Sequence, residues 1–229
     1  MERHFDEELQ SLNEKLLRMA RLVEESIALA VRSLKDRNEL YAQEVFKREG
    51  PINLLDVDVD EECMRLLALR QPMASDLRFI TSGMKIGSEL ERMGDLAVNI
   101  AEVSLDLLKV PPIKPLIDIP RMAALAQGMV KDSLNAFVSR DEKLAREVCL
   151  RDDEVDSLNN QVFRELLTYM MNDPASINRA VGFILVGRHL ERIADHATNI
   201  GEDVIFMVAG KTIKHHIEEI RREAAAKAD

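Results

Sequence analysis

The 229-residue sequence contains no tryptophan, only two cysteines, and few residues that interrupt helices. Aromatic residues make up 4% of the chain, and there are nine glycines and seven prolines. Leucine, alanine, glutamate, methionine and arginine are abundant instead, and these residues favour helices. This composition is typical of an all-α protein, and the length allows one large or two modest domains.

The sequence also lacks a long apolar run and an excess of basic residues. Its longest apolar run, Ala180 to Gly187, is far shorter than the roughly 20 residues of a membrane-spanning helix. The acidic N-terminus is unlike a signal peptide. A formal net charge of −10 is unlike that of a nucleic-acid-binding protein. We therefore expect a soluble, cytoplasmic protein without membrane insertion or nucleic-acid binding, which is able to bind cations or basic partners.

Motifs for common enzymatic chemistries are missing as well. None of the five histidines follows a glutamate by three residues, as in ferritin-like di-metal oxidases, and there is no P-loop or Gly-x-Ser-x-Gly. His196 aligns with Leu96 in the repeat described next, so we expect it to have a structural role. Cys63 and Cys149 lack a Cys-x-x-Cys spacing and are expected to be buried and reduced.

The main positive feature of the sequence is an internal repeat. The segment LERMGDLAVNIAE at 90–102 recurs as LERIADHATNIGE at 190–202, at an offset of 100 residues. The segment that starts at Asn38 corresponds to the one that starts at Asp141, at an offset of 103. Each half contains three long segments with apolar residues at helical spacing. The sequence therefore predicts an all-α fold of two tandem antiparallel three-helix bundles.

The expected boundaries follow from helix caps and prolines. We expect helices at 5–34, 39–70, 77–109, 121–139, 142–171 and 177–209. The expected N-caps are Asn38, Asp76, Asp141 and Ser176. Gly50-Pro51 is expected to kink or interrupt the second helix, and Gly210 to end the last one. The domains would be 1–110 and 121–210, joined by a proline-rich linker at 111–120 and followed by a charged tail at 211–229.

Acidic pairs within the repeat suggest a chemical role. Glu91 and Asp95 are four residues apart, as are Glu191 and Asp195, so each pair shares one helix face. The preceding helix of each half offers a second pair at this spacing. The eight candidate metal ligands are Glu49, Asn53, Glu91, Asp95, Asp152, Asp156, Glu191 and Asp195.

Oxygen ligands of this kind suit Mg²⁺, Mn²⁺, Ca²⁺ or oxo-bridged iron. Because Asn53 carries no charge, the first site is expected to bind a cation more weakly than the second. Two alternatives remain open. The acids could form a solvated face that Arg92 and Arg192 neutralise, on a metal-free helical scaffold, or they could belong to a carboxylate-bridged metalloenzyme.

Three segments closely resemble the PhoU family of negative regulators of bacterial phosphate uptake and phosphate-starvation signalling. They are RQPMASDLR at 70–78, LERMGD at 90–95 and LERIADHATNI at 190–200. The resemblance covers about residues 4 to 216. It implies pseudo-two-fold symmetry between the bundles and surface metal clusters held by acid-x-x-x-Asp pairs, with iron, zinc, manganese or magnesium as the metal. Asn53 departs from this pattern.

The resemblance also implies a function. Family members are thought to act without catalysis, by coupling the ATPase subunit of the phosphate ABC transporter to a membrane sensor histidine kinase. We therefore expect a non-enzymatic regulator that binds both proteins. We further expect a homodimer or higher oligomer that reaches the membrane only through its partners.

Overall fold

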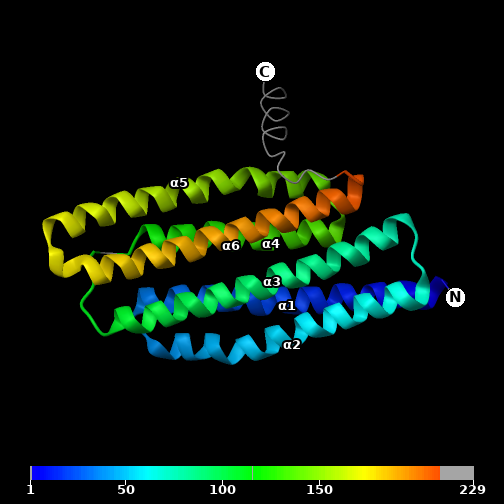
Figure 1. Cartoon of the computed structure of the whole chain (residues 1–229), viewed down its shortest axis with the longest axis horizontal. Coiled ribbons are helices and arrows are strands. Elements are labelled where there is room, and N and C mark those ends of the chain that lie inside the picture. The colour runs from blue at the N-terminus through cyan, green and yellow to red at the C-terminus, as the bar shows by residue number, and fades with distance from the viewer. Residues whose placement is uncertain (1, 115, 212–229) are drawn as a thin grey trace, which may run out of the picture.

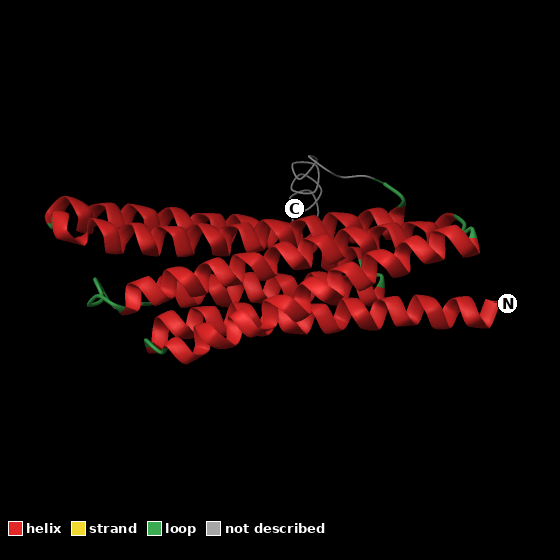
Figure 2. Ribbon diagram, turned by 60° about the horizontal axis from the view of Figure 1, so that its bottom comes forward, coloured by secondary structure: helices red, strands yellow, loops and turns green. Residues whose placement is uncertain are grey.

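The computed structural model describes residues 2–114 and 116–211, and within these ranges it contains helices and no strands. The helices are α1 (Glu2–Asp36), α2 (Glu39–Arg70), α3 (Ala74–Leu108), α4 (Asp118–Ser139), α5 (Glu142–Asn172) and α6 (Ile177–Ala209), with a short 3₁₀ helix η1 (Pro174–Ser176) before α6. The prediction of an all-α fold is confirmed (Figure 2). None of the described helices combines the length and apolar character needed to cross a membrane.

The helices form two layers of the same design. Helices α1, α2 and α3 pack on one another, and α4, α5 and α6 do the same. The two bundles meet where α3 lies against α6 and α1 against α4. Figure 1 shows all six helices running nearly along the long axis of the molecule, with α2 and α5 at its two outer edges. Each outer helix makes its contacts within its own half of the chain.

The buried positions of α2 and α5 establish how the two halves correspond. In α2 they include Ala42, Val45, Ile52, Leu55, Val59 and Cys63. In α5 they include Ala145, Val148, Val155, Leu158, Val162 and Leu166. Each residue of the second set follows its counterpart by 103 positions. The offset inferred from the N-caps thus extends along the core-facing side of both helices, and it identifies equivalent residues on their other sides.

Three of the predicted helix ends are confirmed. The Asn38 side chain accepts a hydrogen bond from the Leu40 N–H at 3.0 Å, and α2 begins at the next residue. Asp141 accepts from the N–H groups of Lys143 and Leu144 and caps α5. Gly210 takes φ +67° at the end of α6, a left-handed conformation that glycine adopts without steric cost. Cys63 and Cys149 are free thiols in the core, as expected.

One predicted cap is wrong, and a second has the predicted position without a capping hydrogen bond. Helix α3 begins at Ala74 with Met73 at its N-cap, so Asp76 lies inside the first turn. Ser176 is the N-cap residue of α6, as predicted, but its side chain makes no capping hydrogen bond. It also ends η1, and its hydroxyl donates to the backbone carbonyls of Asp173 and Tyr169. The reason is that Asp173 accepts a hydrogen bond from the Ala175 N–H and already turns the chain before Pro174, which suits a first helical position.

The Gly50-Pro51 pair does not interrupt α2, which is continuous from Glu39 to Arg70. Both residues are exposed, so water can hydrate the carbonyl group that loses its partner at the proline. Helix α4 begins at Asp118, inside the predicted linker, and the predicted tail lies outside the described residues from 212 onward.

Candidate metal centre

The second bundle brings acidic residues of α5 and α6 together. Burial, followed by the carboxylates of Asp195, Asp156, Asp153 and Glu191, raises the pKa of Asp152 to about 7. The other three predicted ligands of this half are therefore close enough to affect the carboxyl group of Asp152. Acidic pairs from two adjacent helices face each other, as the sequence predicted.

The same repulsion acts on the α6 side of this cluster. Burial and the carboxylates of Asp156 and Asp195 raise the pKa of Glu191. Burial and Asp156 also raise the pKa of Asp195, although His196 and Arg192 oppose the shift. Asn159 on α5 relieves part of the repulsion, because its Nδ2 donates a hydrogen bond of 2.9 Å to Glu191 Oε2. The cluster therefore consists of four carboxylates and one carboxamide.

The first bundle contains an equivalent cluster with one unexpected member. Burial and the carboxylates of Asp95 and Asp56 raise the pKa of Glu91. Burial and Asp60 in turn raise the pKa of Asp56, which is half-buried on α2. The sequence analysis missed Asp56, although its spacing of four residues from Asp60 could have indicated it.

The offset of 103 residues explains the composition of the two clusters. It pairs Glu49 with Asp152, Asn53 with Asp156, and Asp56 with Asn159. Carboxylate and carboxamide have therefore exchanged places between two successive positions on this helix face. Asp56 places a further carboxylate beside Glu91 and Asp95, whereas the roles of Glu49 and Asn53 as ligands remain a prediction.

A glycine of the neighbouring helix lies beside Asp56, and an equivalent glycine lies beside Asn159. A Cβ atom on Gly87 would lie 3.4 Å from Asp56 Oδ1, and one on Gly187 would lie 2.7 Å from Asn159 Oδ1. These glycines are 100 residues apart, the offset of the α3 and α6 repeat. Each one gives a polar side chain of the neighbouring helix room beside the acidic face, which supports the equivalence of Asp56 and Asn159.

The clusters fit a cation in their chemistry. Their donors are oxygen atoms, which hard divalent cations and iron prefer. In each cluster a buried carboxylate oxygen, Asp56 Oδ1 or Asp152 Oδ1, has no hydrogen-bond partner. Within residues 2–114 and 116–211, no three acidic, histidine or cysteine side chains are close enough together to hold a metal ion as they stand. Carboxylates would have to rotate inward on binding, and the eight predicted ligands remain a prediction.

His196 lies on the other side of α6, at the junction of the two bundles. Its Nδ1 is 2.5 Å from Glu89 Oε2 of α3, and Asn199 Nδ2 donates to the same oxygen at 3.2 Å. Together with the Lys85–Asp203 ion pair, these contacts link α3 to α6. His196 is only 8% exposed, so it packs the junction between the bundles.

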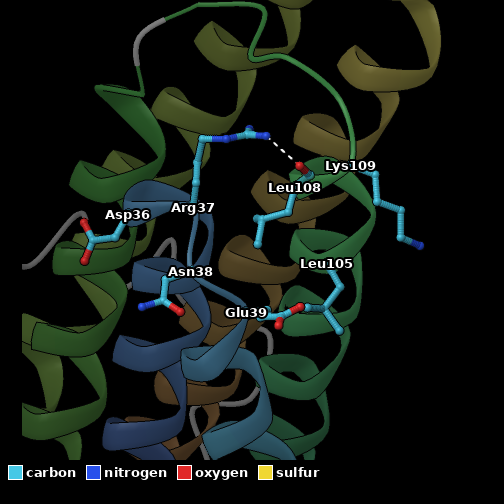
Figure 3. A pocket seen from close by; sticks show the side chains of 7 residues that line it. All are labelled: Asp36, Arg37, Asn38, Glu39, Leu105, Leu108 and Lys109. Carbon is cyan, nitrogen blue, oxygen red and sulfur yellow. Dashed lines mark hydrogen bonds between the residues drawn. The ribbon is translucent and has the colours of Figure 1, made fainter.

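The turn between α1 and α2 and the end of α3 enclose a surface hollow of about 730 Å³ (Figure 3). The Arg37 guanidinium reaches across it and donates to the backbone carbonyls of Leu108 at 2.7 Å and Val110 at 2.8 Å. These bonds satisfy carbonyl groups that the end of α3 leaves without helical partners. The hollow therefore serves the end of a helix and lies apart from the acidic clusters.

Two repeated three-helix bundles, each with an acidic cluster between its second and third helices, define a class of tandem helical-repeat protein. The PhoU domain family matches residues 16–104 and again 119–204, and the chain belongs to this family. The two matches cover the two bundles.

Similar proteins match over nearly their whole length. The phosphate-specific transport system accessory protein PhoU homologue of Aquifex aeolicus is 45% identical over 213 residues, which are 93% of this chain and 96% of that protein. The Caulobacter vibrioides homologue of the same name is 40% identical over 91% of each chain. The crystal structure of PhoU from Pseudomonas aeruginosa superposes with a TM-score of 0.88 at 40% identity, covering 90% of this chain and 100% of that one.

Proposed function

We propose that this protein is an accessory regulator of phosphate transport that acts by binding other proteins rather than by catalysis. The observation that carries this proposal is the similarity to transport accessory proteins over more than nine-tenths of the chain. Function resides in sites rather than folds, so the similarity matters because it extends through both acidic clusters. The absence of Glu-x-x-His from the sequence also favours a binding role over carboxylate-bridged oxidase chemistry.

The partners follow from the family resemblance. We propose that the protein binds the ATPase subunit of the phosphate ABC transporter and a sensor histidine kinase, as a cytoplasmic homodimer or higher oligomer. When phosphate is sufficient, the bound state would hold transport and kinase signalling at a low level. A tandem repeat suits such coupling, because two similar bundles offer two separate surfaces.

Cation binding would support this role. We propose that Asp152, Asp156, Glu191 and Asp195 hold one cation site, and that Glu49, Asp56, Glu91 and Asp95 hold the other, with Asn53 and Asn159 as neutral ligands or hydrogen-bond donors. A bound cation supplies positive charge that offsets the repulsion between carboxylates. Mg²⁺, Mn²⁺ and iron suit this oxygen-rich set better than Zn²⁺, which takes nitrogen and sulfur readily. The carboxylates would then fix α5 against α6, and α2 against α3.

Deletion and complementation in the native host test the regulatory role. In phosphate-rich medium, we expect deletion to raise phosphate uptake and the expression of a reporter gene controlled by phosphate starvation. The wild-type gene should restore both to their low levels. Unchanged uptake and unchanged reporter expression in the deletion strain would contradict the proposal. Pull-down with the wild-type protein, analysed for the transporter ATPase and the kinase, tests the partners directly.

A further inference from the structure

The outward side of α2 exposes apolar residues that the bundle does not use. Leu54, Val57 and Met64 are 69%, 54% and 62% exposed. They lie at spacings of three and seven residues, so they share one face of the helix. A group of three large exposed apolar side chains on one helix face, in which Glu61 lies between Val57 and Met64, is unusual on a surface that only faces water. It is typical of a surface that packs against another molecule.

Acidic residues surround this group. Residues 54–64 contain five acids and no basic residue. Glu62 is paired with Lys15 and Arg65, whereas Asp58, Asp60 and Glu61 are exposed. We define the α2 ridge as Leu54, Val57, Asp58, Asp60, Glu61 and Met64. It combines apolar contact area with a concentrated negative charge.

The equivalent face of α5 does not repeat this combination. The counterparts of the six ridge residues, at the offset of 103, are Ser157, Asn160, Gln161, Phe163, Arg164 and Leu167. None of these is acidic, and Arg164 replaces Glu61. Both helices are outer helices of equivalent bundles, so the fold itself does not require an acidic apolar ridge. The ridge is a property of the first bundle alone.

We propose that the α2 ridge is the docking surface for a basic amphipathic helix of a partner protein. Its apolar group would receive one face of such a helix, and Asp58, Asp60 and Glu61 would pair with flanking lysine or arginine residues. The ridge repels anionic lipid surfaces and nucleic acids. A second copy of this chain would bring a net charge of −10 to the contact. A basic helix is therefore the occupant that the charges favour.

A synthetic helical peptide tests the docking surface. The probe is a fluorescent 18-residue peptide of leucine and lysine with leucine on one face, and the control peptide has the same composition in scrambled order. Fluorescence anisotropy measures binding to the full chain at low and moderate salt, with EDTA present. We expect the amphipathic peptide to bind more tightly than the scrambled one, and binding to weaken as salt rises.

Two double variants locate the binding site. Leu54→Ser with Met64→Ser removes apolar area, and Asp58→Asn with Glu61→Gln removes charge. Each should weaken peptide binding by about tenfold or more, because buried leucine-sized contacts and charge pairs dominate such interfaces. The matched control, Phe163→Ser with Leu167→Ser on α5, should change affinity by less than about twofold. All these side chains are at the surface, and circular dichroism melts verify that each variant folds.

Equal peptide affinity in both ridge variants and the wild type would overturn the inference, as would an equal loss in the α5 control. Conversion of an oligomer into a monomer by the Leu54/Met64 variant, seen in sedimentation velocity, would assign the ridge to a second copy instead. The inference rests on the proposed role in binding proteins, but not on cation binding. If wild type and ridge variants bind the peptide equally while the transporter ATPase and the kinase are still captured, the ridge proposal fails while the proposed function stands.

Discussion

Asn159 Nδ2 donates a hydrogen bond of 2.9 Å to Glu191 Oε2, joining α5 to α6 within the second acidic cluster. The equivalent residue of the first cluster is Asp56, which raises the pKa of Glu91 instead of bonding to it. At the equivalent positions of α2 and α5 a carboxylate and a carboxamide are exchanged, and the carboxamide of Asn159 is bonded to Glu191. The hydrogen bond from Asn159 to Glu191 therefore distinguishes the second cluster from the first.

Exchanging this carboxamide and carboxylate should change stability in opposite directions. Without metal at pH 8, Asn159→Asp should lose about 1–2 kcal/mol of unfolding free energy, because it removes a donor and adds a fifth acid. Asp56→Asn should gain about 1 kcal/mol by the reverse change. Urea unfolding in EDTA measures both, and the two shifts should shrink when Mn²⁺ is added. A loss of stability in Asp56→Asn would contradict this account of the first cluster.

The pKa of Asp152 predicts a pH dependence of the metal-free protein. Its folded pKa of about 7 is raised from an ordinary value of 3.8. As pH rises from 4 to 7, the unfolded state ionises this group first, so its contribution to stability falls and then levels off above pH 7. Asp152→Asn should therefore stabilise the protein at pH 8 by on the order of 2 kcal/mol, below the roughly 4 kcal/mol of the full shift.

At pH 4 the same substitution should have almost no effect, because Asp152 is then largely protonated in the folded protein. Urea titrations in EDTA at the two pH values provide the comparison. An equal change in unfolding free energy at pH 4 and pH 8 would show that ionisation of Asp152 does not destabilise the metal-free protein. Cation binding near pH 7 should also release protons, which calorimetry in buffers of different ionisation enthalpy detects.

Gly201 should be the least tolerant of the helical glycines in the second bundle. A Cβ atom there would lie 3.0 Å from the Ala145 carbonyl oxygen and 3.0 Å from Cys149 Sγ. The backbone of α5 would have to shift, so Gly201→Ala should cost about 1–2 kcal/mol despite the better helix propensity of alanine. Gly128→Ala, where the nearest atom is 3.9 Å away, should instead gain up to about 1 kcal/mol. Thermal melts compare the two variants.

The contact between Glu89 and His196 should stabilise the junction of the bundles in a pH-dependent way. Burial opposes ionisation, but hydrogen bonds with His196 and Asn199 prevail and lower the pKa of Glu89. Its contribution is therefore present above the ordinary pKa of 4.5 and is lost as pH falls through the folded value. Glu89→Gln should cost about 1–3 kcal/mol at pH 7, and the cost should shrink as the pH falls through the folded pKa of Glu89.

A control substitution at an exposed ion pair shows whether the cost of Glu89→Gln is specific to the junction. Lys47→Ala removes the Lys47–Glu44 pair, whose side chains are 70% and 44% exposed. Exposed pairs of this kind contribute little, so the cost should be much smaller than that of Glu89→Gln. Urea unfolding of both variants at pH 7 decides the comparison. A similar loss of unfolding free energy for the two substitutions would show that the contact between Glu89 and His196 does not stabilise the junction.

The sequence predicted the features that depend on local periodicity and repetition. The apolar stripes of helical spacing predicted all six helices, and the caps at Asn38 and Asp141 appear where expected. The repeated acidic segments predicted that α6 acids would meet α5 acids. These features are encoded by residues close together in the chain, so one sequence is enough to find them.

The features that were missed depend on neighbours from other helices. Asp56 was overlooked because its counterpart Asn159 is an amide, and only packing against α3 reveals that it faces Glu91. The contact of His196 with Glu89 requires the arrangement of the two bundles, which helical spacing does not encode. Ser176 holds its predicted N-cap position but makes no capping bond, because its hydroxyl donates to the Asp173 and Tyr169 carbonyls where Asp173 and Pro174 turn the chain.

The central claim is that the two acidic clusters hold cations, and counting bound metal tests it most directly. Elemental analysis by mass spectrometry would be performed on protein loaded with Mn²⁺ and then dialysed, for the wild type and for Glu191→Ala with Asp195→Ala. We predict that this variant loses about one site per chain, while the outward-facing control Asp58→Ala with Glu61→Ala keeps the wild-type content. Equal metal content in all three proteins, or none in the wild type, would contradict the account.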